Sequence, residues 1–335
     1  MMRLPRFRYL APASLAEAAQ MLHQEGPTAA VVAGGTDLYP NMKRRHQTPK
    51  VLVGMRRIPG IAEVTGSAER GFAIGPMITL TRLGQHAALR QAFPALAFAA
   101  GTVSTPLLRN MGTLGGNICL DTRCNYYDQN YEWRKSIHFC MKKDGDTCWV
   151  APGSDKCLAV SSTDTAPVLC ALGAKLTLQS VRGTREIEAT ELYRDDGIQY
   201  RTKAPDESLT RIALPPLNGT RCAYWKLRRR GSFDFPVLAA AARVDLDRGG
   251  VVTKASLYFG GAGSRPMAAK AAAALLVGNK PTVALIEQAA AAAVANARPM
   301  DNTDLVANWR KQMARVYAQR ALLEATGLGP AQGRA

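Results

Sequence analysis

Four of the seven cysteines of this chain lie in one short stretch, at Cys124, Cys140, Cys148 and Cys157. They are separated by 15, 7 and 8 residues, which is neither the paired spacing of a zinc ribbon nor the compact run of a bacterial ferredoxin. Four thiolates can bind tetrahedral zinc or a cubane iron–sulfur cluster, and the spacing does not distinguish them. Free buried thiols are the third interpretation. The stretch therefore predicts a metal site and leaves the metal open.

Two glycine-rich turns precede this stretch and could bind phosphate. The first, Ala33-Gly-Gly-Thr-Asp37, follows an apolar run, and the second is Gly112-Thr-Leu-Gly-Gly-Asn117. Glycines allow a sharp turn in which several backbone N–H groups point at one spot. Either turn alone could be a tight turn without a ligand, but two in one domain predict a long dinucleotide such as FAD. Neither fits Gly-x-Gly-x-x-Gly or a Walker loop, so a nicotinamide site or an ATPase is not predicted.

The remaining candidate side chains have ordinary structural explanations. Cys119, Cys170 and Cys222 lie in or beside apolar runs and are expected in the core. Asp164 precedes an expected helix and could be its N-cap, and Lys226 could be a surface lysine on a strand. The histidines show no metal-ligand or triad spacing, and we expect no catalytic acid, base or nucleophile in this chain.

The composition is that of an ordinary globular protein with a strong positive charge: 335 residues, 47% hydrophobic, formal net charge +17. No run approaches the roughly 20 apolar residues of a membrane span, and the N-terminus has no apolar segment typical of secretion. A cytoplasmic location with reduced thiols is therefore expected. The charge predicts either a solvated basic surface or an acidic redox partner. Nucleic acid is not expected, because the basic runs Lys43–Arg45 and Arg228–Arg230 lack interleaved aromatics.

Helices and short strands must position these residues on both sides of an irregular segment. Residues 118–160 show no helical or strand period, and their aromatic content favours an ordered functional loop. A double proline indicates a domain boundary near residue 217, and the tail after Gly327 is expected to be disordered. We expect helices at 15–25, 81–90, 94–101, 165–172, 237–242, 283–297 and 303–325, and strands at 29–33, 51–53, 71–75, 174–178, 205–216, 223–227 and 255–259.

Four segments, in their order and spacing, resemble the FAD-binding subunits of the xanthine oxidase family of molybdenum hydroxylases, the flavoprotein class of the medium subunit of molybdenum carbon monoxide dehydrogenase. They are Ala33–Asp37, Arg109–Asn117, Asp164–Leu169 and Gly260–Pro266. The resemblance covers most of the chain and implies an α+β fold. It places a two-subdomain FAD-binding domain at 1–217 with an iron–sulfur insert at about 118–160, a smaller C-terminal sheet-and-helix domain at 218–327, and a tail at 328–335.

The resemblance also implies FAD contacts for particular residues. Asp164 would contact the FAD, and Lys226 would lie near the isoalloxazine ring. Relatives place a tyrosine against the flavin ring, but neither Ile198 nor Tyr200 aligns with it. The pyrophosphate would be held by Val31, Val32, Ala33, Gly34, Gly35, Thr36, Asp37 and Leu38 in the first turn and by Thr113, Leu114, Gly115, Gly116 and Asn117 in the second.

The gap between Asn117 and Asp164 is longer than in ordinary members and contains the four clustered cysteines. In this the chain resembles the beta subunit of 4-hydroxybenzoyl-CoA reductase, which has an additional [4Fe–4S] cluster in such an insert. The resemblance implies that Cys124, Cys140, Cys148 and Cys157 ligate this cluster. It further implies that ferredoxin reduces the cluster, and that electrons pass through FAD to a [2Fe–2S] subunit and a molybdenum subunit. The complex would be a dimer of heterotrimers that reduces 4-hydroxybenzoyl-CoA to benzoyl-CoA.

Two alternatives stay open. In a related hydroxylase, electrons would leave the molybdenum site through this flavin subunit. In a different class of function, the chain would be a basic zinc-binding protein that contacts nucleic acid.

Overall fold

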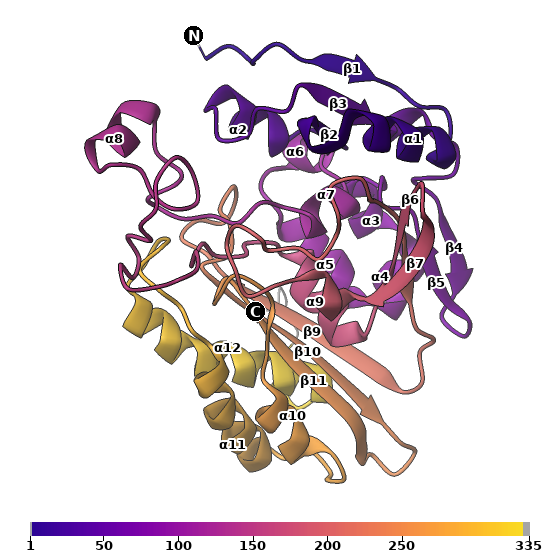
Figure 1. Ribbon diagram of the computed structural model, residues 1–335. Coiled ribbons are helices and arrows are strands. Elements are labelled where there is room, and N and C mark those ends of the chain that lie inside the picture. The colour runs from indigo at the N-terminus through magenta and orange to yellow at the C-terminus, as the bar shows by residue number, and fades with distance from the viewer. Residues whose placement is uncertain (1, 331–335) are drawn as a thin grey trace.

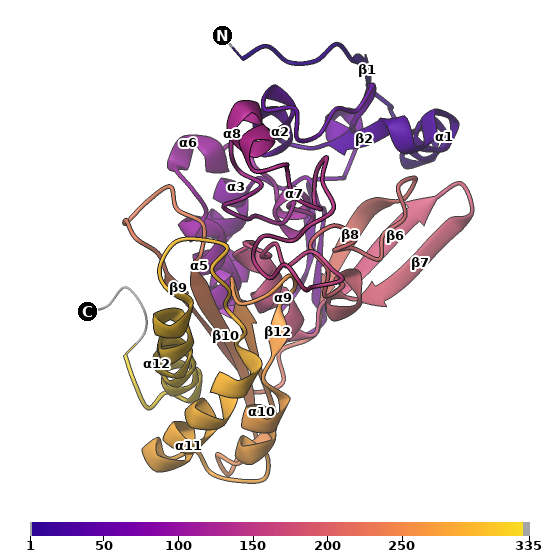
Figure 2. The same ribbon diagram turned by 60° about the vertical axis from the view of Figure 1, so that its left-hand side comes forward.

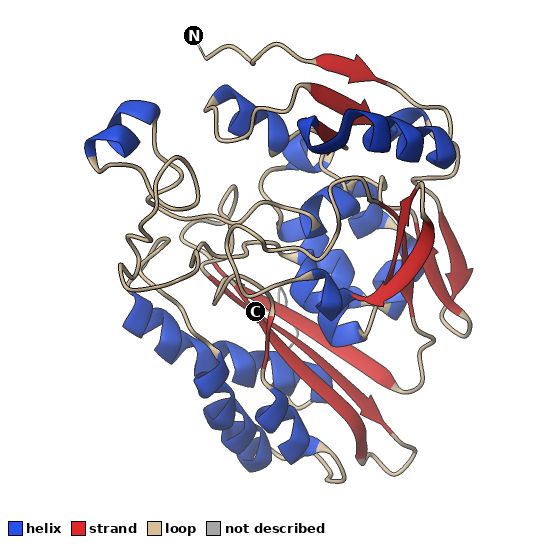
Figure 3. Ribbon diagram, viewed as in Figure 1, coloured by secondary structure: helices blue, strands red, loops and turns tan. Residues whose placement is uncertain are grey.

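The computed structural model describes residues 2–330, which form three sheets with helices between and outside them (Figures 1 and 3). The sheets have the strand orders β1-β3-β2, β4-β5-β8-β6-β7 and β12-β11-β10-β9. The strands are β1 Arg8–Leu10, β2 Ala29–Val32, β3 Val51–Gly54, β4 Val64–Ser67, β5 Gly71–Ile74, β6 Lys175–Ser180, β7 Gly183–Glu188, β8 Ser208–Leu214, β9 Thr220–Leu227, β10 Leu238–Leu246, β11 Val252–Gly260 and β12 Met267–Ala268. The α-helices are α1 Leu15–Glu25, α2 Leu38–Lys43, α3 Leu80–Gln85, α4 Ala87–Ala92, α5 Pro94–Thr102, α6 Pro106–Arg109, α7 Leu114–Ile118, α8 Tyr131–Ser136, α9 Thr165–Leu172, α10 Lys270–Leu276, α11 Val283–Ala293 and α12 Ala307–Thr326.

The first sheet is parallel, and α1 packs on it. The expected ends of α1 are confirmed: the Ser14 hydroxyl accepts a hydrogen bond from the Glu17 amide, and Gly26 ends the helix with φ of 58°. The core between helix and sheet contains Leu22 and Val53, both fully buried. This packing fixes the carboxyl end of β2, from which the first glycine turn begins.

The second sheet is antiparallel, and its buried face contacts a group of helices formed by α3, α4, α5, α7 and α9. Figure 2 shows this sheet beside the helices and below the first sheet. The second glycine turn leads into α7, which packs against α9. The two glycine turns therefore start from different parts of the fold and meet between them.

The third sheet lies between two layers of helices, with α5 and α9 on one face and α10, α11 and α12 on the other (Figure 1). Strand β10 is central, and its side chains alternate between the two cores. Ala239 and Ala241 belong to the core with α9, whereas Ala240 and Ala242 belong to the core with α12. The expectation of a helix at 237–242 is therefore wrong. Alanine favours helices only weakly, and here small side chains fit a strand that is covered on both faces.

Two further expectations need smaller corrections. The helix expected at 81–90 is two helices, because His86 takes an extended conformation and its Nδ1 accepts a hydrogen bond from the Leu89 amide. The helix expected from 303 begins only at Ala307. Of the expected tail, residues 331–335 lie outside the described residues. The other expected helices and strands are present, with ends shifted by a few residues.

The segment 118–160 is irregular, as expected, and contains one short helix, α8. It extends away from α7 to the side of the molecule where α2 lies (Figure 1). Backbone pairing between Arg123 and Val160 closes its base. Among the helices of the described residues, none is long and apolar enough to cross a membrane.

Arg310 joins α12 to the third sheet and to the turn that follows it. Its side chain is fully buried, and the guanidinium donates to the carbonyl oxygens of Val237 at 2.8 Å, Met300 at 2.9 Å and Gly261. Burial lowers the pKa of Arg310 to about 10, which still leaves the group charged at neutral pH. One guanidinium therefore satisfies three carbonyl groups from three separate segments.

We expect Arg310→Met to lower the free energy of unfolding by about 3 kcal/mol or more, because buried carbonyl groups lose their donors. Arg315→Met is the matched control, since Arg315 lies exposed on the same helix; it should change stability by less than about 0.5 kcal/mol. Chemical denaturation of both variants tests this. Equal stability of the two variants would contradict the role assigned to Arg310.

Candidate functional site

The two glycine turns are in direct contact. A side chain on Gly34 would overlap the carbonyl oxygen of Met111, which precedes the second turn. Only glycine allows this approach, and it brings the backbone of residues 34–36 beside that of residues 112–116. Thr113 caps α7, since its Oγ1 accepts a hydrogen bond from the Gly116 amide at 3.0 Å. The two turns thus meet at one space, and the backbone amides of residues 114–117 in the second turn already donate to acceptors within the protein.

This space is part of a cavity of about 900 Å³, large enough for a dinucleotide. Most residues predicted to contact FAD line it. Those predicted residues that line it are Val31, Ala33, Gly34, Gly35, Thr36, Asp37, Leu38, Thr113, Gly115, Gly116, Asn117 and Asp164. Val32 and Leu114 do not; their side chains are buried in the cores beneath the turns.

Lys226 lies behind the cavity wall, where it forms a buried ion pair. Its Nζ is 3.0 Å from Asp164 Oδ1 and donates to the Thr102 carbonyl at 3.0 Å. The Tyr224 hydroxyl donates to Asp164 at 2.7 Å. Burial raises the pKa of Asp164 and lowers that of Lys226, and each charge opposes the shift of the other. Asp164 therefore lines the cavity while two donors hold its carboxylate. Lys226 is one of these donors and does not line the cavity itself.

Asn117 connects the second turn to the start of α9. Its Oδ1 accepts hydrogen bonds from Thr163 Oγ1 at 2.8 Å and from Thr165 Oγ1 at 2.7 Å. This arrangement orients the turn relative to Asp164, although the two are far apart in the chain. Asn117 consequently has a structural task in addition to lining the cavity.

Sequence reasoning missed several residues of the cavity wall. Asp121 and Arg123, from the start of the insert, line the cavity, and Arg123 forms an ion pair with Asp37 of the first turn. Tyr200 also lines the cavity, whereas Ile198 is exposed. The proximity of Asp121 and Arg123 to Asn117 in sequence was an available signal. For Tyr200 the sequence offered only an unaligned tyrosine, because an irregular loop places it.

The four clustered cysteines come together. Cys124, Cys140, Cys148 and Cys157 are all buried, none forms a disulfide, and all four line a second, small cavity of about 10 Å³. Its other walls include Tyr127 and Trp149. Burial raises the pKa of Cys124 to about 12 and that of Cys157 to about 11, so these thiols are protonated unless a metal binds them.

Four buried thiols around one small space are a donor set that a metal ion or a metal cluster could use. Within residues 2–330, no group of three or more His, Cys, Asp or Glu side chains is already arranged to hold a single metal ion. The thiols instead surround a space. In a tetrahedral zinc site, bonds of about 2.3 Å bring the sulfur atoms within about 4 Å of each other. Four thiolates are also the donor set of a cubane cluster, in which each thiolate binds a different iron.

Comparisons with known proteins find two family models that match successive parts of the chain. Residues 5–217 match the family model described as the FAD binding domain in molybdopterin dehydrogenase, and residues 223–325 match the CO dehydrogenase flavoprotein C-terminal domain. The chain is 30% identical to the nicotinate dehydrogenase FAD-subunit of Eubacterium barkeri, over 84% of this chain and 83% of that protein. It is also 30% identical to the carbon monoxide dehydrogenase medium chain of Afipia carboxidovorans, over 94% of this chain and 95% of that one.

The fold comparison is equally extensive. The structure of reconstituted CO dehydrogenase from Oligotropha carboxidovorans matches with a TM-score of 0.80 and 27% identity, over 98% of this chain and 100% of that chain. The α+β fold predicted from the sequence is confirmed. The family model that matches residues 5–217, which form the walls of most of the large cavity, is an FAD-binding domain. The chain belongs to the FAD-binding medium subunits of the molybdenum hydroxylase family, and is an oxidoreductase subunit.

Proposed function

We propose that this chain is a flavin subunit with an additional [4Fe–4S] cluster, in a molybdenum enzyme of the 4-hydroxybenzoyl-CoA reductase type. The observation that supports this most strongly is the pair of adjoining cavities, one lined by both glycine turns and one by four buried thiols. Family membership supports the flavin subunit. The narrower assignment depends on the cysteine insert and on the reductase that it resembles.

In this proposal the FAD pyrophosphate lies between the two glycine turns, where the first turn supplies backbone N–H donors and the Thr36 hydroxyl. Asp164 contacts the FAD with its carboxylate held by Tyr224 and Lys226. Tyr200 is the candidate to shield the flavin ring. Cys124, Cys140, Cys148 and Cys157 bind the cluster, and Tyr127 and Trp149 help to exclude water from it. When bound, FAD exchanges electrons in pairs or singly, and the cluster exchanges them one at a time.

The wider complex would contain a [2Fe–2S] subunit and a molybdenum subunit, as a dimer of heterotrimers, with ferredoxin as electron donor. The second candidate is a related hydroxylase in which electrons flow outward. Two relatives that are named as dehydrogenases favour this second candidate. Assays of the purified complex decide: reduced ferredoxin should convert 4-hydroxybenzoyl-CoA to benzoyl-CoA. Absence of this reaction, with oxidation of another substrate instead, would favour the second candidate.

We expect Gly116→Ala to weaken FAD binding by about tenfold or more, because Gly116 is exposed to the cavity and a methyl group there takes space beside Thr113 Oγ1. A tenfold loss corresponds to about 1.4 kcal/mol. Gly101→Ala is the control, because a methyl group on Gly101 meets no atom within 4 Å. Titration of flavin-free protein with FAD measures both. Unchanged affinity in Gly116→Ala would argue against pyrophosphate binding at this turn.

We expect wild-type protein to be yellow-brown, with four irons and acid-labile sulfide, and Cys140→Ser to lose the iron while FAD stays bound, because FAD occupies a different cavity. Cys170→Ser is the control, since Cys170 is a buried cysteine of the helical core; its iron content should be unchanged. Iron, sulfide and flavin analysis gives the result. Four irons in Cys140→Ser would refute the ligand assignment, and colourless wild-type protein containing zinc would support the zinc-binding alternative.

We expect reduction by ferredoxin, an acidic protein, to slow as ionic strength rises, because exposed basic residues steer the encounter and salt screens them. The insert itself has six basic and six acidic residues, and the exposed run Lys43-Arg44-Arg45 lies beside it, since Arg44 Nη1 is 3.7 Å from Asp128 Oδ1. Lys43→Gln with Arg45→Gln should slow reduction at low salt, whereas Lys254→Gln with Lys280→Gln should not. Stopped-flow rates test this, and a flat salt response would contradict steering.

A further inference from the structure

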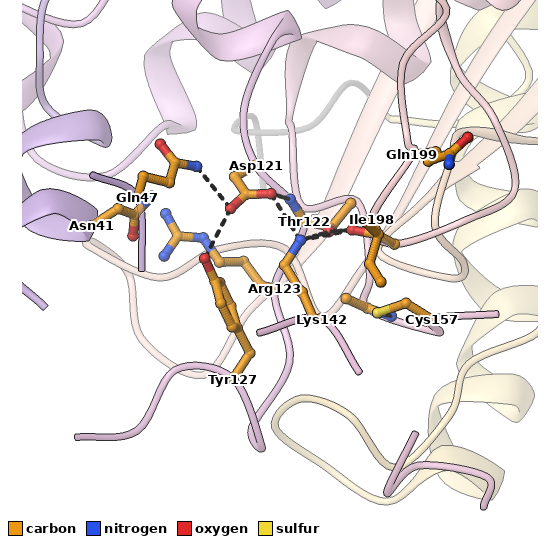
Figure 4. A network of polar contacts seen from close by, with 12 residues as sticks. Asn41, Gln47, Asp121, Thr122, Arg123, Tyr127, Lys142, Cys157, Ile198 and Gln199 are labelled. Atoms are coloured by element: carbon orange, nitrogen blue, oxygen red, sulfur yellow. Dashed lines mark hydrogen bonds and ion pairs between the residues drawn. The ribbon is translucent and has the colours of Figure 1, made fainter. Parts of the chain in front are cut away.

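A buried polar network, drawn in Figure 4, connects residues that line the two cavities. Its centre is Asp121, whose side chain is 7% exposed, and Lys142, whose side chain is 6% exposed. Lys142 lines the thiol cavity, and Asp121 lines the FAD cavity. The two side chains form an ion pair, with Lys142 Nζ at 2.9 Å from Asp121 Oδ1. A charged residue of the cysteine insert is therefore buried at the wall shared by both cavities.

Every donor of the Lys142 ammonium is satisfied. Besides Asp121, it donates to Thr122 Oγ1 at 2.7 Å and to the Gly197 carbonyl at 2.6 Å. Asp121 in turn accepts from Gln47 Nε2 at 3.0 Å. An ammonium with three partners cannot turn away, so its position relative to the thiol cavity is fixed.

Gly197 holds this network against Cys157. Its amide donates to the Cys157 carbonyl at 2.7 Å, and a side chain at this position would lie 2.6 Å from Cys157 Sγ. The Lys142 charge therefore lies close to a thiol that we assign to the cluster. Burial raises the pKa of Cys157, and the Lys142 charge acts against this by favouring the thiolate.

Two aromatic rings complete the wall around the ammonium. Lys142 Nζ lies 4.9 Å from the centroid of the Tyr127 ring and 5.5 Å from that of the Tyr200 ring. Tyr127 lines the thiol cavity and its hydroxyl donates to Asp121 at 3.4 Å, whereas Tyr200 lines the FAD cavity. The ammonium is shielded from water by these rings, so its field acts in a medium of low effective dielectric constant.

The geometry points to Lys142 as a positioning residue whose fixed charge raises the reduction potential of the cluster, with Asp121 as its opposing charge. This inference depends on the proposed cluster. A one-electron reduction, with the electron supplied by a one-electron donor protein, adds one negative charge to the thiol cavity. A buried positive charge beside the cavity stabilises the reduced form, and a buried negative charge destabilises it. Lys142 is nearer to the thiols, so its effect dominates.

The test is the sign of two potential shifts. In Lys142→Met, the cluster potential should fall by about 59 mV or more, a tenfold change for one electron. In Asp121→Asn it should rise. Lys143→Met is the matched control, because Lys143 is the next residue, pairs with Asp144 and is 34% exposed, so solvent screens its charge; its potential should not change. Redox titrations of the purified complex, followed by the paramagnetic signal of the cluster, give all three values.

Lys142→Met leaves Asp121 buried without its partner, which destabilises the fold. The double variant Lys142→Met with Asp121→Asn removes both charges, should retain four irons, and should show a potential between those of the single variants. If the cluster potential shifts in the same direction in Lys142→Met and Asp121→Asn, this inference alone is overturned. The same holds if the potential does not shift in either variant while both keep four irons. Absence of iron and sulfide from the wild-type protein would overturn the proposed cluster and this inference together.

Discussion

The insert of residues 118–160 has only a small buried core of its own, and this constraint governs how the rest of the site can be built. It contains one helix of six residues, and its buried cluster consists of three of the clustered cysteines with Tyr127 and Ala159. Long irregular loops in compact proteins need some other source of order. The proposed metal ligation would supply it, because binding free energy at a site of thiolates adds to folding free energy. Three of the same cysteines form most of the buried core of the insert.

The FAD cavity depends on the opposite kind of packing. The first turn is fixed by a parallel sheet and the second by a bundle of helices, and the contact at Gly34 joins them. These elements have large apolar cores, so the cavity does not depend on the insert for its shape. The insert contributes part of the wall through Asp121 and Arg123. A flavoprotein fold of this kind can therefore accept the proposed second cofactor site without losing the first.

Much of this could be predicted from the sequence where a local rule decides the structure. Ser14 and Gly26 fixed the ends of α1, and the glycine turns were found because only glycine permits their contacts. The alanine-rich strand β10 was not predicted, because its conformation is decided by two layers of helices that lie far away in sequence. Lys142 was not predicted either. Nothing around it in sequence shows that Gly197 and Asp121 will enclose it.

The presence of a buried ion pair between the cavities calls for a reason other than stability. Apolar side chains of similar volume would stabilise the wall between the two cavities at least as well. The free-energy cost of removing two charges from water usually exceeds the free energy gained from their attraction. The Asp121–Lys142 network is nevertheless hydrogen-bonded throughout, so its dipoles keep their orientation when charge arrives nearby. A fixed field of this kind biases where an electron resides, which apolar packing cannot do. Electron transfer between two adjoining cofactors is a function in which such a bias has a direct effect.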